Sequence, residues 1–99
     1  MSLRLPIPHE ALSRFCRAHG VREVAVFGSA VRDDFHDDSD VDILIDLGPD
    51  ARVGLVELQR MRDELAQIWG RPVDLLTRDG LNPNIRDAVL EEAEIIHAQ

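Results

Sequence analysis

The chain is poor in several features that would place it in specialised classes of protein. It contains a single cysteine, Cys16, so no disulfide can form within it and a reducing compartment is favoured. Aromatic residues are scarce and tyrosine is absent. No segment approaches the roughly 18 consecutive apolar residues of a membrane-spanning helix, and the first residues lack the apolar stretch of a signal peptide. These absences favour a cytoplasmic protein without a membrane segment.

Basic residues are outnumbered by acidic ones, which gives a net charge of −8. Such a chain repels the backbone of DNA or RNA, so direct nucleic-acid binding is disfavoured. Seven aspartates and no Lys or Arg lie between positions 33 and 46. The first of these acids are typical of a solvated turn. Asp40 and Asp42 instead interrupt an apolar segment, so a solvated turn does not explain them.

The length of 99 residues predicts one domain, 1–99, with no visible repeat or linker. A hydrophobic content of 44% and a charged content of 30% fit an ordinary globular domain. Apolar periodicity and breakers such as Gly20 and Gly70 delimit the expected elements. These are a helix over 8–19, strands over 24–27 and 40–47, a helix over 52–69, a strand over 73–77, and a last helix from Asn82 that carries its apolar stripe to Ile96.

This order predicts an α/β (α+β) fold with a small mixed β-sheet backed by helices, in the sequence α-β-β-α-β-α. The segment 24–27 is apolar throughout, which is typical of a central strand. Cys16 lies on the apolar side of the first helix and is expected in the core. His9, His19 and His97 lack the spacing of metal ligands and are expected at the surface or at helix ends.

Three aspartates form the strongest chemical signal in the chain. Asp40 and Asp42 are two positions apart on an expected strand, so both project from one face of the sheet. Asp74 lies in another apolar segment and would join them if its strand pairs with theirs. Clustered carboxylates destabilise one another unless a cation compensates, and hard divalent cations prefer such oxygen ligands. We therefore predict a two-metal site suited to phosphoryl displacement, with Asp46 outside it as a strand-end or turn-capping residue.

A candidate phosphate site precedes these acids. Gly28 and Ser29 directly follow a buried strand, where glycine permits close approach of the backbone. Successive N–H groups and the serine hydroxyl can then hold phosphate oxygens. Arg32, one turn further on, either reaches the polyphosphate or forms a surface ion pair with a neighbouring acid.

These motifs resemble a known group of enzymes. The run Phe27-Gly28-Ser29, a ten-residue gap, Ser39-Asp40-Val41-Asp42, and the later Val73-Asp74-Leu75 are similar to the nucleotidyltransferase superfamily related to DNA polymerase β. The small size resembles the minimal nucleotidyltransferases, the antitoxin halves of HEPN–MNT toxin–antitoxin pairs. Relatives often read Gly-Ser-Arg-Ala-Arg-Gly, and this chain departs from that pattern at Ala30 and Asp33.

The resemblance implies roles for the matched residues. Gly28 and Ser29 would bind the triphosphate of ATP, and Asp40 and Asp42 would bind Mg²⁺. Asp74 would complete the metal site and help to activate the acceptor hydroxyl. The implied reaction transfers AMP from ATP to a tyrosine of a HEPN ribonuclease toxin, which is thereby silenced.

Two other functions remain open from the sequence. The chain could be a non-catalytic module that masks the toxin, or a catalytic subunit that modifies a small molecule with a partner chain. A masking module has no need of the three aspartates, which favours an enzyme. In every case the chain is too short to build an acceptor pocket as well, so a partner is expected.

Overall fold

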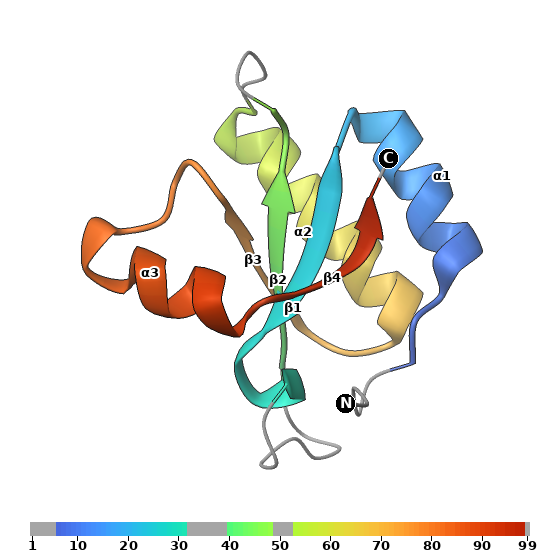
Figure 1. The fold of residues 1–99 in the computed structure, drawn as a ribbon. Helices are drawn as coiled ribbons and strands as arrows, with labels where there is room; N and C mark the ends of the chain where they lie inside the picture. The colour runs from blue at the N-terminus through green and yellow to red at the C-terminus, as the bar shows by residue number, and fades with distance from the viewer. Residues whose placement is uncertain (1–5, 32–39, 49–52, 99) are drawn as a thin grey trace.

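The computed structural model describes residues 6–31, 40–48 and 53–98 (Figure 1). Along the chain lie α1 (His9–His19), β1 (Glu23–Phe27), a 3-10 turn η1 (Gly28–Val31), β2 (Val41–Asp46), α2 (Leu55–Trp69), β3 (Val73–Thr77), α3 (Pro83–Glu92) and β4 (Glu94–Ala98). Within these ranges, none of the helices has both the length and the apolar character needed to cross a membrane.

The four strands form one sheet in the order β3-β2-β1-β4. β1 is antiparallel to both of its neighbours, whereas β2 and β3 are parallel, so the sheet is mixed. The predicted fold class is therefore confirmed, and so is the central position of β1. The apolar run of β1 has a direct reason, since neighbours on both edges and helices on one face remove it from water.

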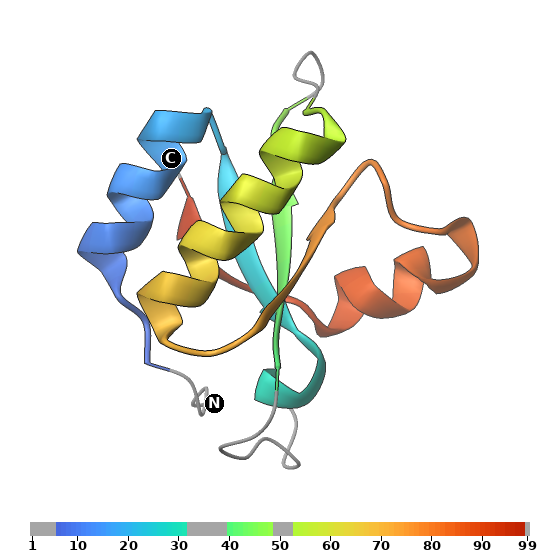
Figure 2. The ribbon, with the colours of Figure 1, turned by 180° about the vertical axis from the view of Figure 1, so that it is seen from behind.

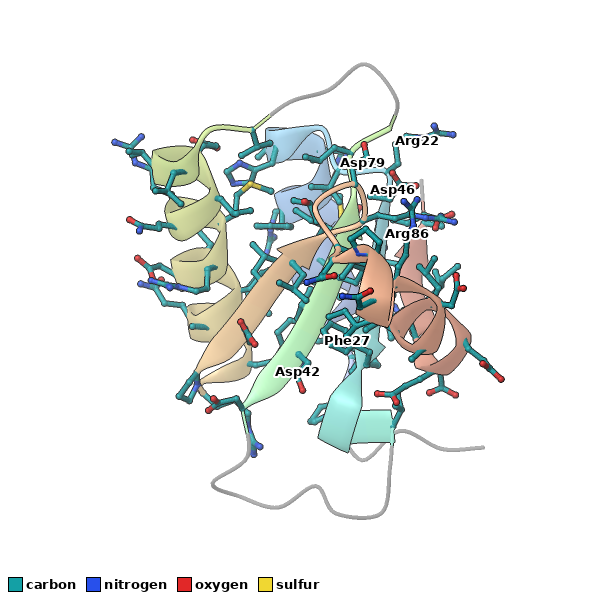
Figure 3. The ribbon with its side chains drawn as sticks, turned by 90° about the vertical axis from the view of Figure 1, so that its left-hand side faces the viewer. Arg22, Phe27, Asp42, Asp46, Asp79 and Arg86 are labelled. Atoms are coloured by element: carbon teal, nitrogen blue, oxygen red, sulfur yellow. The ribbon has the colours of Figure 1, made fainter. Side chains whose placement is uncertain are left out.

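The main core lies between the sheet and the helices α1 and α2, which cover the same face (Figure 2). Alternate strand residues such as Val24, Val26, Ile43 and Ile45 point into it and are fully buried. A smaller cluster of Ala25, Leu44 and Leu81 lies on the opposite face, against α3. Figure 3 shows α2 and α3 on opposite sides of the sheet.

The end of the chain corrects the prediction of one long terminal helix. α3 stops at Glu92, because Ala93 adopts an extended conformation with φ −65° and ψ 137°. The residues after it, including Ile96, then form β4 along the free edge of β1. The pattern of apolar residues was misread as helical because strand pairing depends on an edge that lies about 70 positions away in sequence.

The remaining boundaries stay close to the predictions. α1 and α2 end at Gly20 and Gly70 as expected, both in the left-handed conformation of a helix C-cap. α2 begins at Leu55, and the predicted start at 52 lies outside the described residues. β2 begins at Val41, so Asp40 directly precedes the strand.

Candidate active site

The ends of three strands bring the candidate site together. In the antiparallel pair β1–β2, Phe27 is opposite Asp42. In the parallel pair β2–β3, Asp42 is opposite Asp74. The strand pairing needed to bring Asp74 beside the earlier acids is therefore present, and Figure 3 shows Phe27 and Asp42 near one end of the sheet. Both aspartates alternate with core residues, so they lie on the face that α3 partly covers.

Asp42 and Asp74 form a pair of neighbouring carboxylates. Paired residues on adjacent strands are separated by about 4.8 Å in the hydrogen-bonding direction. Asp42 is partly buried, while Asp74 is exposed on the edge strand. Both side chains leave the same face of the sheet, so their carboxylates can approach a common cation. The pair can therefore accept a divalent cation from the solvent side.

Asp40 directly precedes this ladder, and its predicted role beside Asp42 and Asp74 stays a prediction. It is exposed and precedes β2, whose first residue donates a hydrogen bond from the Val41 N–H to the Pro72 carbonyl at 2.9 Å. Among the residues that the structure describes, no three Asp, Glu, His or Cys side chains form a metal-binding group. Mg²⁺ commonly takes only one or two protein carboxylates and completes its shell with water and substrate phosphates. The Asp42–Asp74 pair fits that requirement.

Gly28 occupies the turn between β1 and η1 in a conformation that favours glycine, with φ +72°. A Cβ atom placed there would overlap the carboxylate of Asp42, whose Cγ would lie only 2.9 Å away. Glycine is thus required both by the backbone and by the side chain of a candidate metal ligand. The sequence predicted close approach of this backbone to a phosphate, and the structure adds a close approach to Asp42.

The remaining members of the predicted phosphate site are only partly described. The backbone of Ser29 lies in the 3-10 turn that Gly28 begins. Arg32, Asp33 and His36 lie outside the described residues. The roles predicted for Ser29 and Arg32 therefore stay predictions.

Glu92 is a residue of this region that sequence reasoning missed. Its Oε1 accepts a hydrogen bond from the N–H of Gly28 at 2.5 Å, and the contact is partly buried. Glu92 lies within the segment from Asn82 to Ile96, whose mostly apolar stripe predicted a helix. An acid within such a stripe was the one signal available that a polar partner lies there.

Asp46 has a structural role, as predicted. Its Oδ1 accepts a hydrogen bond from the Gly48 N–H at 2.9 Å, and its Oδ2 lies 3.7 Å from a guanidinium nitrogen of Arg78. Four positions along an extended strand separate it from Asp42 by about 13 Å. This acid is therefore engaged in the turn after β2 and stands away from the candidate metal ligands.

Cys16 and His19 take no part in the candidate site. Cys16 is fully buried in the main core, as predicted, and burial raises the pKa of its thiol to about 11. His19, at the end of α1, links that helix to α2. Its ring nitrogens lie 2.7 Å from Glu57 and 2.5 Å from Glu64.

Comparison with known proteins identifies the class. The model of the nucleotidyltransferase domain family matches residues 9–96, so this chain belongs to that family and the predicted enzyme class is confirmed. The protein adenylyltransferase MntA of Thermococcus cleftensis is 40% identical over 73 residues, covering 74% of this chain and 72% of the relative. The solved structure of a candidate minimal nucleotidyltransferase is 36% identical, with a TM-score of 0.70 over 86% of this chain and 85% of the other.

More distant solved structures share the fold. A toxin–antitoxin structure with AMP-PNP has a TM-score of 0.75 at 16% identity, covering 91% of this chain and 73% of that one. A complex of the tri-AMPylated HEPN toxin of Shewanella oneidensis with its MNT antitoxin has a TM-score of 0.67 at 14% identity, covering 91% and 69%. At these identities the likeness establishes the architecture that surrounds the candidate site.

Proposed function

We propose that this protein is a Mg²⁺-dependent adenylyltransferase that transfers AMP from ATP to a tyrosine hydroxyl of a HEPN-type toxin and thereby acts as an antitoxin. The observation that carries the proposal is the pairing of Asp42 with Asp74 beside the Gly28 turn. Carboxylates next to a backbone turn are the chemistry that a metal-bound nucleoside triphosphate requires. ATP as the substrate is consistent with a cytoplasmic location.

Each predicted site residue has a role in this reaction. Asp40, Asp42 and Asp74 would hold Mg²⁺, which would neutralise negative charge on the phosphate oxygens. The turn at Gly28 and Ser29, with Arg32, would hold the triphosphate. The acceptor oxygen would bond to the α-phosphorus while the bond from that phosphorus to the β-bridging oxygen breaks, releasing pyrophosphate. Asp74, which is exposed, is suited to receive the proton of the acceptor hydroxyl.

The acceptor would come from another chain. This chain contains no tyrosine, so a modified tyrosine must belong to a partner. A groove of about 140 Å³ beside Asp74 is lined by Leu55, Leu58 and Arg62, and Leu55 is 72% exposed. The name of the Thermococcus relative supports a protein as the acceptor, and the AMPylated toxin of the Shewanella complex supports a HEPN toxin.

The test combines the purified protein, ATP, Mg²⁺ and the HEPN-type protein encoded beside its gene. Mass spectrometry should show the toxin gaining whole AMP units on tyrosine. The double variant Asp40→Asn/Asp42→Asn should lose this transfer. Asp46→Asn is the matched control, because it removes an acid from the same strand and keeps an oxygen for the Gly48 N–H.

Three results would separate the proposal from its alternatives. Equal labelling by the double variant and the wild type would exclude the metal-ligand roles. A wild type that never labels the toxin but still neutralises it would be a masking antitoxin. A wild type that labels only a small hydroxylated compound in the presence of the partner would be a catalytic subunit with a different acceptor.

A further inference from the structure

We propose that Glu92 is a positioning residue of the nucleotide site, which holds the Gly28 turn in the orientation that receives the triphosphate. This proposal rests on the proposed function. Its basis is the hydrogen bond from the Gly28 N–H to Glu92 Oε1, which joins residues 64 positions apart. The acceptor is a carboxylate, and hydrogen bonds to ionised acceptors are about twice as strong as neutral ones.

The fold places Glu92 at this point through the backbone. β4 pairs with β1 so that Glu94 is opposite Val26. Antiparallel strands run in opposite directions, so the residue two positions before Glu94 lies near the residue two positions after Val26. This places Glu92 beside Gly28. Ala93 between them packs on the small core cluster and fixes the end of α3.

Gly28 is thereby held on two sides by acids. The carboxylate of Asp42 lies against its Cα, and that of Glu92 accepts from its N–H. Both contacts are side chains of other elements, β2 and α3, so the position of the turn is set by the sheet and the last helix together. Gly28 is buried, and without Glu92 its N–H would lose this charged acceptor.

The contact also decides which backbone groups remain for phosphate. The Gly28 N–H is engaged by Glu92, so the phosphate donors must be the later N–H groups of η1, which begins at Gly28. The negative charge of Glu92 would repel a triphosphate and weaken its binding if the residue had no other effect on the site. Glu92 would still favour nucleotide binding if the gain from orienting the later N–H donors is larger than the loss from this repulsion.

The experiment compares Glu92→Ala, Glu92→Gln and Glu91→Ala. Glu91→Ala is the matched control, because it removes the same charge from the neighbouring, exposed position of α3. Binding of a fluorescent ATP analogue with Mg²⁺ should weaken about tenfold or more in Glu92→Ala, as for other groups that orient ligating residues. Glu92→Gln keeps an oxygen acceptor and should restore most of the affinity, and Glu91→Ala should bind as the wild type does.

Two further measurements distinguish a positioning role of Glu92 from partial unfolding of the variant. The KM for ATP should rise in Glu92→Ala while the KM for the toxin stays unchanged, whereas a partly unfolded enzyme would lose only kcat. In the ¹⁵N-resolved NMR spectrum, the Gly28 amide proton should move upfield in Glu92→Ala and keep its position in Glu91→Ala. This reading tests the hydrogen bond without any catalysis.

Several outcomes would overturn the proposal. Tighter nucleotide binding by both Glu92 variants would make the carboxylate a competitor of phosphate. Unchanged nucleotide binding and an unchanged Gly28 amide resonance in Glu92→Ala would show that the hydrogen bond between Glu92 and Gly28 does not form. A wild type that binds ATP but transfers nothing would overturn the proposed function, while the binding and NMR results would still decide the role of Glu92.

Discussion

Gly28 meets two independent constraints at a single backbone position. Its φ of +72° strains any residue with a side chain, and a Cβ atom would collide with Asp42. Gly20 has nearly the same conformation, with φ +71°, but nothing lies within 4 Å of a Cβ placed there. A substitution at Gly20 would therefore test backbone strain alone, whereas one at Gly28 would test strain together with the collision.

We predict that Gly28→Ala is more damaging than Gly20→Ala. The strain alone should lower the free energy of unfolding by about 1 kcal/mol at Gly20. At Gly28 the collision adds to that loss and displaces Asp42, so adenylyl transfer should also fall below detection. Urea denaturation and the toxin-labelling assay measure the two effects. Equal losses of stability, with activity retained in Gly28→Ala, would show that the turn yields easily at this point.

Cys16 gives the chain an unusual dependence on alkaline pH. Burial raises the pKa of its thiol from 9.0 to about 11, because the thiolate would lose its hydration in the core. The chain contains no tyrosine, and all eleven of its basic residues are arginine. Between pH 9 and 11, therefore, Cys16 is the side chain whose titration can change the stability.

The sign follows from the raised pKa. Below pH 9 both the folded and the unfolded chain carry a neutral thiol, and the stability is fully present. As the pH rises toward 11 the unfolded chain ionises first, so the free energy of unfolding should fall by an amount of the order of 2 kcal/mol. Urea denaturation from pH 8 to 11 measures this. Cys16→Ala should start less stable but show a flat profile, and a parallel fall in both proteins would assign the effect elsewhere.

At the scale of elements, local signals predicted most of the architecture. The helices α1 and α2 have clear apolar stripes and end at glycines, and β1 is apolar throughout. Such signals are contained within each segment, so the sequence reveals them directly. The class of fold and the central strand followed from them.

The last strand and the Glu92 contact were not predictable in this way. α3 has no buried residue, and every residue of β4 is either exposed or half-buried. Neither segment has a strong pattern of its own, so the free edge of β1 determines what the final residues become. The hydrogen bond of Glu92 depends in turn on that pairing, and only the assembled sheet brings it to Gly28.

The candidate site shows the same division. The spacing of Gly28, Asp40 and Asp42 and the apolar surroundings of Asp74 identified the residues that a metal and a triphosphate would need. Which of them pair could not be read from spacing, because it depends on β2 and β3 lying side by side with Asp42 opposite Asp74. The position of Asp40 ahead of β2, outside that ladder, also required the structure.

The two faces of the sheet differ, since one carries the main core and the other the candidate metal ligands. One face is covered by α1 and α2 over the main apolar core, and His19 links these helices through Glu57 and Glu64. The other face carries the smaller cluster and the paired acids Asp42 and Asp74. In a chain with a net charge of −8, a cation bound by these two acids would offset part of the negative charge.

This balance predicts that Mg²⁺ with ATP stabilises the whole domain. A ligand that binds only the folded state adds about 1.4 kcal/mol when its concentration is ten times its Kd, which corresponds to several degrees in the Tm of a domain of this size. Neither Mg²⁺ nor ATP alone should match the two together, because the carboxylates and the phosphates need the cation between them. Differential scanning fluorimetry at millimolar Mg²⁺ and ATP measures the shift.

The variants Asp42→Asn and Asp74→Asn make this thermal test specific. Each removes one candidate ligand of the cation, so the shift with Mg²⁺ and ATP should disappear. Asp46→Asn should keep the shift, since that acid is engaged with Gly48 and Arg78. A wild-type domain whose Tm does not move, or an Asp42→Asn domain that gains as much as the wild type, would contradict a metal–nucleotide site between β2 and β3.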